Sequence, residues 1–297
     1  MKPAWGGSVL IACLAWTSAG VARANVPDVK AAATLRAKYG ELRDKLSNNQ
    51  FKLPLYLDSR QTSGDLRGDI HAVVDYPFAK VSAALKGAPH WGDILFLHLN
   101  VKYCRASEDK QGNRLTVYIG RKYDQPLDAA YRVEFIYSVA AETPDYLQVV
   151  LKAEDGPVST KDYRIMLEAT PLDGGQTFLH LSYSYAFGFA ARLATQIYFS
   201  TLGSAKVGFT VIGKQPDGQP IYVDDMRAAL ERNTMRYYLA IDAYLGAFSA
   251  PQDEQLEKRL RSWFTSTERY PLQLHEETQN EYLAMKHKEY RRQQVER

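Results

Sequence analysis

Residues 66–85 read LRGDIHAVVDYPFAKVSAAL, and this stretch decides the fold class. Its first ten residues predict a strand in which Ile70 and Val74 share the buried face, although Val73 breaks the alternation. Pro77 can begin a helix because its missing N–H would have no partner in the first helical turn. Gly87 ends that helix, whose spacing predicts one apolar stripe made of Phe78, Val81, Ala84 and Leu85.

Downstream, a second short helix is predicted over residues 91–97, and alternating apolar residues then predict six strands. The turn PLDGG at 171–175 joins the last two as a hairpin. Period-two alternation is typical of an antiparallel sheet with one buried face and one wet face. A Gly/Pro-rich connector at 213–220 then leads to a long helix over 223–248. The predicted strands cover residues 99–106, 115–123, 131–140, 147–151, 163–169 and 178–187.

The flanks of this unit are helical. Leu35, Tyr39, Leu42 and Leu46 fall on one helical face, and an edge strand at 53–57 follows, as Pro54 suggests. Residues after 252 are polar and rich in charged side chains of both signs. The tail from 286 is predicted to be solvated. The chain therefore divides into an N-terminal helix and edge strand at 25–64, a main domain at 65–248 and a C-terminal helical extension at 249–297.

The first 24 residues have the pattern of a signal peptide. Lys2 supplies a positive charge, residues 9–16 are apolar but too short to span a membrane, and Ala22-Arg23-Ala24 is a small-x-small cleavage site. The sequence thus predicts cleavage after Ala24 and a periplasmic or secreted protein. Two alternatives stay open, namely a lipoprotein anchored at Cys13 and an uncleaved anchor.

Charge and cysteine content exclude some functions. The formal net charge is +3, and loss of Lys2 and Arg23 leaves about +1. This charge gives no sign of the basic surface that binds nucleic acid. Without its signal peptide the chain keeps one cysteine, Cys104, so it can form no internal disulfide. Cys104 is predicted to be a buried small side chain, with a reactive thiol as the alternative.

No motif predicts catalysis, a metal site or a cofactor. His275-Glu276-Glu277 lacks the second histidine of a zinc helix, and neither a Gly-x-Ser-x-Gly elbow nor a Gly-rich phosphate loop is present. The other histidines are scattered and are predicted to have surface or capping roles: His71, His90, His98 and His180. Alternating strand charges predict a solvated ion-pair ladder of Arg132, Glu134, Arg164 and Glu168.

The central order resembles the START-like superfamily, also called the helix-grip or Bet v 1-like fold, which includes polyketide cyclases and lipid-transfer proteins. The resemblance rests on Asp69 to Phe78 running into Val81 and Leu85, on Trp91, and on the last hairpin from Asp162 to Tyr185. It implies an α+β fold in which a curved antiparallel sheet of about seven strands wraps around the long C-terminal helix. It also implies a cavity between sheet and helix.

If the cavity exists, the apolar residues on one face of each strand line it. The alternative is a filled core. Tyr137, Tyr183 and Tyr185 could orient a ligand's polar end, because buried tyrosine hydroxyls need partners. The expected partner is an apolar small molecule such as a lipid. The predicted ligand-binding residues are Val117, Val133, Phe135, Tyr137, Val149, Leu151, Ile165, Leu167, Leu181, Tyr183, Tyr185 and Tyr237.

Three functions follow from this pattern: an exported binding or carrier protein, a cyclase- or hydrolase-like enzyme of the same fold, and a structural or adaptor protein. Residues 190–202 are apolar and predicted to be a gate or a membrane-touching flap, with an extra packing helix as the alternative. The sequence indicates neither the ligand nor the oligomeric state.

Overall fold

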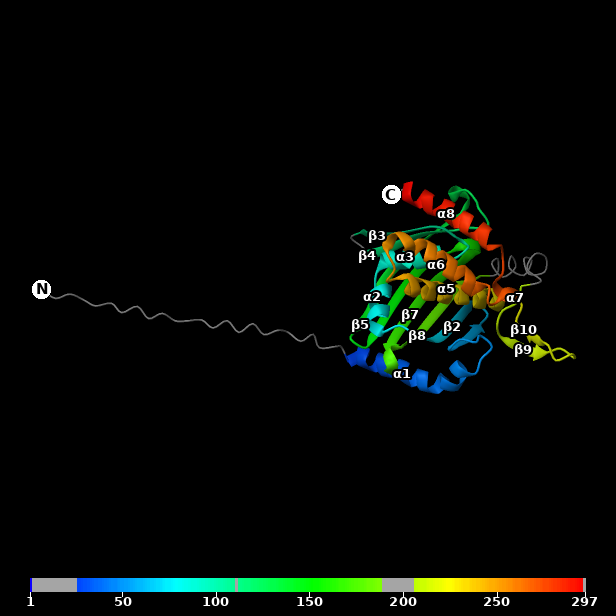
Figure 1. Ribbon diagram of the computed structural model, residues 1–297, viewed down its shortest axis with the longest axis horizontal. Helices are drawn as coiled ribbons and strands as arrows, with labels where there is room; N and C mark the ends of the chain where they lie inside the picture. Colours follow the sequence, from blue (N-terminus) through cyan, green and yellow to red (C-terminus); the bar gives the residue numbers. More distant parts are fainter. Residues whose placement is uncertain (2–25, 110–111, 189–205, 296–297) are drawn as a thin grey trace.

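The computed structural model describes residues 1, 26–109, 112–188 and 206–295 (Figure 1). Its centre is one antiparallel sheet of eight strands in the order β1-β2-β8-β7-β6-β5-β4-β3. The last strand of the series, β8, therefore returns to pair with β2. The strands are β1 (Leu55–Gln61), β2 (Asp65–Val74), β3 (Val101–Asp109), β4 (Gly112–Ile119), β5 (Tyr131–Thr143), β6 (Tyr146–Asp155), β7 (Thr160–Pro171) and β8 (Thr177–Phe187).

The sequence predicted this sheet, and β1, which begins just after Pro54, forms one of its edges. Three short 3₁₀ turns interrupt the connections, and the one between β7 and β8 is the predicted hairpin turn. Gly174 and Gly175 have φ values of 79° and 78° there, a region that favours glycine. The turns are η1 (Leu127–Ala129), η2 (Pro157–Ser159) and η3 (Asp173–Gly175).

One face of the sheet, the inner face, is covered by the long helix α5 (Met226–Ala247) against β1, β2 and β8. The helices α2 (Phe78–Leu85) and α3 (Ala88–Phe96) pack on the same side, with α3 against β3 and β4. Asp225 caps α5 by accepting a hydrogen bond from the backbone N–H of Arg227. Gly68 allows the close approach, since a Cβ at that position would lie 2.5 Å from Oγ1 of Thr234.

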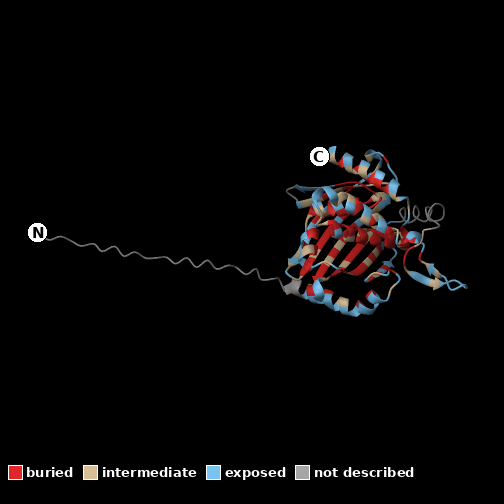
Figure 2. Ribbon diagram, in the orientation of Figure 1, coloured by how far each residue is buried: buried red, intermediate tan, exposed pale blue. Residues whose placement is uncertain are grey.

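The opposite face, the outer face, is crossed by α1 (Val26–Ser47), which lies along the other side of the strands in Figure 1. Leu35, Leu42 and Leu46 are buried against Tyr146 and Phe178, as the helical spacing predicted. The middle of the sheet is thus covered on both faces, and Figure 2 shows its strands as the most buried part of the molecule. This arrangement is the α+β helix-grip fold that the sequence predicted, with an additional helix behind the sheet.

One flanking segment holds structure that the sequence did not predict, and one prediction about the flanks was wrong. The Gly/Pro-rich connector contains a small hairpin of β9 (Val211–Lys214) and β10 (Pro220–Tyr222). The tail from residue 286 is not solvated, because Lys286 and Glu289 are fully buried in an ion-pair cluster. The C-terminal helices are α6 (Gln252–Thr267), α7 (Pro271–Leu274) and α8 (Gln279–Val295).

The predicted signal peptide and the apolar segment 190–202 lie outside the described residues. Among the helices that the structure does describe, none is both long enough and apolar enough to cross a bilayer.

Candidate ligand site between the sheet and helix α5

The strand register brings all the predicted ligand-binding residues to the inner face or onto α5. They belong to or pack against one apolar cluster, in which Tyr185 and Tyr237 are partly buried and the other ten are buried. The sequence therefore identified the residues between the sheet and α5. Their role in holding a ligand stays a prediction.

Four tyrosines gather at one end of this interior. The rings of Tyr183 and Tyr237 are 5.2 Å apart, and those of Tyr163 and Tyr185 are also 5.2 Å apart. The hydroxyls of Tyr183, Tyr185 and Tyr237 form no hydrogen bond with a described residue, whereas that of Tyr163 contacts Thr160. Burial raises the pKa of Tyr183, Tyr185 and Tyr237. These phenols therefore remain protonated and able to donate.

His98 lies beside this group and is only 3% exposed, so of the predicted surface or capping roles the surface role is wrong for this residue. Its ring lies 5.1 Å from that of Tyr237. Nδ1 accepts a hydrogen bond of 3.1 Å from the backbone N–H of Asn100, while Nε2 forms no well-aligned hydrogen bond with a described residue, although the side chain of Asn233 is close enough to raise the pKa of the ring. Burial, followed by the positive charges of Arg236 and Lys286, lowers the pKa of His98 well below its ordinary value. The ring is thus neutral, and because Nδ1 accepts, Nε2 carries the proton.

Tyr137 provides a second unpartnered group on the inner face. Its hydroxyl is buried without a hydrogen bond. The register places Tyr137, Leu151, Ile165 and Tyr183 in one row across β5, β6, β7 and β8. Three strand spacings separate the two tyrosines by about 14 Å. An apolar strip thus runs between two phenols that have no hydrogen-bond partner among the described residues.

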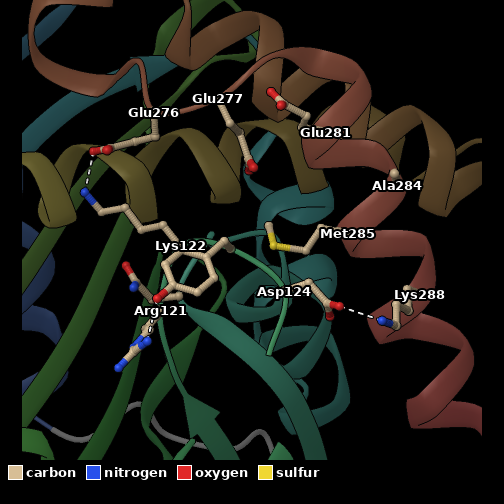
Figure 3. Close-up of a pocket in the computed structure, with 11 residues that line it drawn as sticks. Arg121, Lys122, Asp124, Glu276, Glu277, Glu281, Ala284, Met285 and Lys288 are labelled. Carbon is tan, nitrogen blue, oxygen red and sulfur yellow. Dashed lines mark hydrogen bonds and ion pairs between the residues drawn. The ribbon is translucent and has the colours of Figure 1, made fainter. Parts of the chain in front are cut away.

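A cleft of about 1210 Å³, lined mainly by charged residues, lies between residues 121–124 and α8 (Figure 3). Asn100 also lines this cleft, and its backbone N–H donates to His98. Glu276 forms ion pairs at one side of it, at 2.5 Å to Lys122 and 2.8 Å to Arg236, the neighbour of Tyr237 on α5.

Some of the other charged side chains of the cleft have a partner and one carboxylate oxygen does not. Lys288 binds Asp124 and Arg121 donates to the hydroxyl of Tyr123, whereas Oε1 of Glu277 is buried without a partner. Burial raises the pKa of Glu277 to about 7. Figure 3 shows its carboxylate pointing into the space near Met285.

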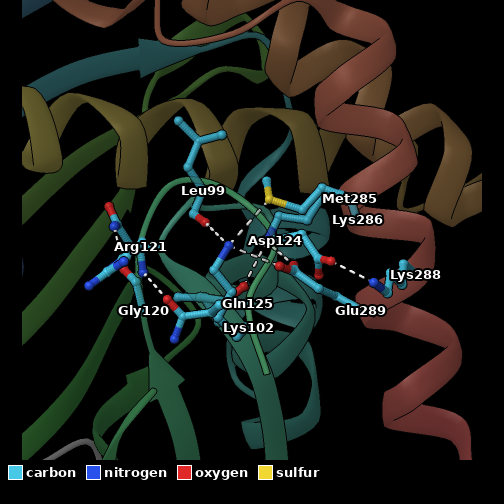
Figure 4. Close-up of polar contacts among 12 residues, drawn as sticks. Leu99, Lys102, Gly120, Arg121, Asp124, Gln125, Met285, Lys286, Lys288 and Glu289 are labelled. Atoms are coloured by element: carbon cyan, nitrogen blue, oxygen red, sulfur yellow. Dashed lines mark hydrogen bonds and ion pairs between the residues drawn. The ribbon is translucent and has the colours of Figure 1, made fainter. Parts of the chain in front are cut away.

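A buried ion cluster supports the segment that carries His98 (Figure 4). Glu289 of α8 accepts from Lys102 and from Lys286, both at 2.9 Å, and all three side chains are fully buried. Lys286 also donates to the carbonyls of His98 and Val101, and Lys102 donates to that of Leu99. Burial lowers the pKa of Lys286 to about 8. The C-terminal extension thus fixes the backbone on either side of His98.

Several of these residues escaped sequence reasoning. The charged pattern of α8 predicted solvent, and only Lys102, a lysine within an apolar strand, could have indicated a buried partner. Cys104 is buried as predicted, and burial raises the pKa of its thiol.

The solvated-ladder prediction holds for Arg132 with Glu134, which form a half-exposed pair, but Glu168 is instead bound to His180 beneath α1. In the described part of the chain, no three His, Cys, Asp or Glu side chains converge on a metal position.

Comparison with known proteins identifies no family for the chain. No protein-family model matches it, and no curated protein sequence matches it. Some solved structures can be aligned with its structure. Human StAR-related lipid transfer protein 5 is 10% identical over 74% of this chain and 99% of its own, with a TM-score of 0.36. Truncated norcoclaurine synthase from Thalictrum flavum is 12% identical over 48% of this chain and 90% of its own, with a TM-score of 0.33.

An uncharacterised protein of Bacillus thuringiensis gives a TM-score of 0.30, at 10% identity over 46% of this chain and 93% of its own. At such scores these neighbours add nothing to the argument from the sheet order and α5. The sheet order and α5 themselves give the α+β helix-grip architecture that the sequence predicted.

Proposed function

We propose that the protein binds or carries an apolar small molecule, such as a lipid, between the inner face of the sheet and α5. The observation that carries the proposal is the set of unpaired polar groups in an otherwise apolar interior: Nε2 of His98 and the hydroxyl of Tyr137. A buried polar atom without a partner costs about 1–3 kcal/mol. A ligand with a hydrogen-bonding group at His98 and an apolar body along the strands would remove part of this cost.

An enzyme of the same fold is the second candidate, because a neutral histidine lies buried beside tyrosines. However, Nδ1 of His98 already accepts a backbone hydrogen bond, so Nε2 is a donor. In this tautomer Nε2 of His98 can donate a hydrogen bond to a substrate oxygen but cannot remove a proton. The geometry therefore favours binding over base catalysis.

An adaptor role has less support. The apolar residues of the C-terminal helices, among them Trp263, Leu274 and Tyr282, are buried in the main core. Little of their apolar surface is left for a partner.

Export through a cleaved signal peptide is part of the proposal and rests on the sequence of residues 1–24 alone. N-terminal sequencing of the protein from a fractionated bacterial host tests it. We expect a periplasmic or secreted form that begins at Asn25. A cytoplasmic chain that retains Lys2 would contradict export without affecting the ligand site.

The binding proposal is tested by extracting the purified protein with organic solvent and identifying the released molecules by mass spectrometry. Uptake of a fluorescent phospholipid and a fluorescent sterol by the delipidated protein is measured in parallel. We expect His98→Phe to weaken uptake about tenfold, since a single hydrogen bond to a buried group is worth about that factor. His90→Phe is the matched control, because His90 lies near the start of α3, away from the turn that carries His98, and bonds to the carbonyl of Ala84. Absence of any extracted or captured apolar molecule would refute the proposal.

A further inference from the structure

A second pocket lies on the outer face, between α1 and the sheet, and is independent of the site described above. Its volume is about 470 Å³, within the range of small-molecule sites. One wall belongs to α1, and side chains of four strands make the floor. The lining residues are Lys30, Ala31, Thr34, Leu35 and Lys38 on α1, and His71, Tyr146, Gln148, Glu168 and His180 on the sheet.

The pocket follows from two regular spacings. On α1 the lining residues recur at one face of the helix. On the sheet, the register places His71, His180, Glu168 and Gln148 side by side across β2, β8, β7 and β6. A row of polar side chains therefore faces one stripe of the helix.

Most of the floor is satisfied by its own contacts. His180 lies between Glu168 and Asp69, at 2.7 and 2.8 Å, and Asp69 is also bound by Arg67. Tyr146 donates to the other oxygen of Glu168. Burial alone would lower the pKa of His180, but its hydrogen bonds to the two carboxylates outweigh burial and raise it. His180 is thus an imidazolium whose two N–H groups are both used.

His71 is the exception. Its ring stacks on that of His180 with centroids 4.3 Å apart and planes 2° apart. The residue is 8% exposed and Nδ1 has no hydrogen-bond partner. Burial, together with the charge of His180, lowers the pKa of His71 to about 3. A neutral histidine is therefore left without a polar partner in the floor of the pocket.

The wall opposite His71 is cationic and apolar. Lys38 pairs with Glu41, whereas the ammonium group of Lys30 has no acidic partner among the described residues. Ala31 and Leu35 place apolar surface between the two lysines. The groups left free are a lysine and a neutral histidine, and these complement an anion rather than a cation.

We propose that this pocket binds a small organic anion, with its charged group toward Lys30 and His71 and its apolar body against Ala31 and Leu35. Because Asp69, Arg67, Glu168 and His180 satisfy one another, they hold the floor rigid while His71 remains available. The ligand class is that of a simple carboxylate with a short apolar or aromatic body.

The test is a titration of the purified protein, labelled with ¹⁵N-histidine, with sodium benzoate at constant pH and ionic strength. NMR follows the imidazole resonances of His71 and His180, assigned through single His→Gln variants. Benzamide is the neutral isostere, and inorganic phosphate is the anion without an apolar body. Lys30→Gln removes the free charge, and Lys45→Gln is the matched control on the same helix outside the pocket.

We expect benzoate to shift the His71 resonances saturably and Lys30→Gln to weaken its binding about tenfold. Lys45→Gln should leave the affinity unchanged. The absence of a saturable shift, equal binding of benzamide, or equal affinities of the two lysine variants would each overturn the proposal. Phosphate binding as tight as benzoate would overturn the assignment of an organic ligand. Both lysines are exposed, so neither variant is expected to unfold the protein.

Discussion

The two faces of the sheet bury polar groups in opposite ways. On the outer face, beneath α1, His180 is held by two carboxylates in a satisfied network, and Nδ1 of the stacked His71 is the exception. On the inner face, beneath α5, His98 and Tyr137 keep buried polar atoms without a partner. A satisfied network stabilises the empty protein, whereas an unsatisfied group costs stability and is retained where something else binds it. The difference separates the polar groups that stabilise the fold from those that are free to bind a ligand.

The largest expected effect is on the outer face. Glu168→Ala removes one of the two anions around a buried imidazolium and should lower the free energy of unfolding by about 3 kcal/mol. Glu134→Ala is the matched control on the same face, where the half-exposed pair with Arg132 is worth about 0.5 kcal/mol. Urea unfolding measures both. Equal losses would show that the His180 network contributes no more than a surface ion pair.

His180 and His98 should make stability depend on pH in opposite directions. His180 has a raised pKa, so native His180 keeps a proton that the unfolded chain loses above about pH 6.5. The contribution of His180 to the free energy of unfolding is complete below that pH and is lost as the pH rises. His98 has a lowered pKa, so its contribution is complete above about pH 6.5 and is lost as the pH falls. Each effect changes the free energy of unfolding by about 1.4 kcal/mol per pH unit.

Chemical denaturation of wild type, His180→Gln and His98→Gln across pH 5–8 measures this difference. It corresponds to about one proton taken up or released on unfolding. Relative to wild type, His180→Gln should remove a decline above pH 6.5, and His98→Gln should remove a decline below it. Groups that do not interact with the replaced histidine cancel in the comparison with wild type, whereas loss of the His180 charge also removes one cause of the lowered pKa of His71. Identical pH profiles for the two variants would contradict the contrast between the faces.

The smallest effects come from a matched pair of hydroxyl deletions. Tyr146→Phe removes a hydrogen bond to Glu168 on the outer face and should cost about 1.5 kcal/mol. Tyr137→Phe removes a buried hydroxyl that has no partner, so the empty protein should be unchanged or slightly more stable. Thermal unfolding of both variants provides the measurement. A loss at Tyr137 as large as that at Tyr146 would mean that its hydroxyl already has a partner.

The sequence predicted the inner face better than the outer one. Alternation of apolar residues in each strand marks the inner face without knowledge of which strands are neighbours, so Val149, Ile165 and Leu181 were placed correctly. The outer network depends on the pairing of β2 with β8, which lie about a hundred residues apart. No local sequence pattern predicts that His71 and His180 stack or that α1 covers them.

The C-terminal extension shows the same limit. Residues from 286 onward read as a solvated helix because their charges are frequent and their apolar residues few. Lys286 and Glu289 pair with each other, and Lys102, which lies far away in the sequence, adds a second positive charge to the same carboxylate. Ion pairs between distant segments cannot be read from either segment alone.

Photo-crosslinking tests the central claim most directly. A fatty acid with a diazirine at the end of its chain is bound to the delipidated protein, irradiated, and located by mass spectrometry of the digested protein. We predict crosslinks in the inner-face peptides around Tyr137, Ile165 and Tyr183, and their loss when an unlabelled lipid competes. Crosslinks confined to α1 or to the exposed outer face, or none that a competitor removes, would contradict a ligand site between the sheet and α5.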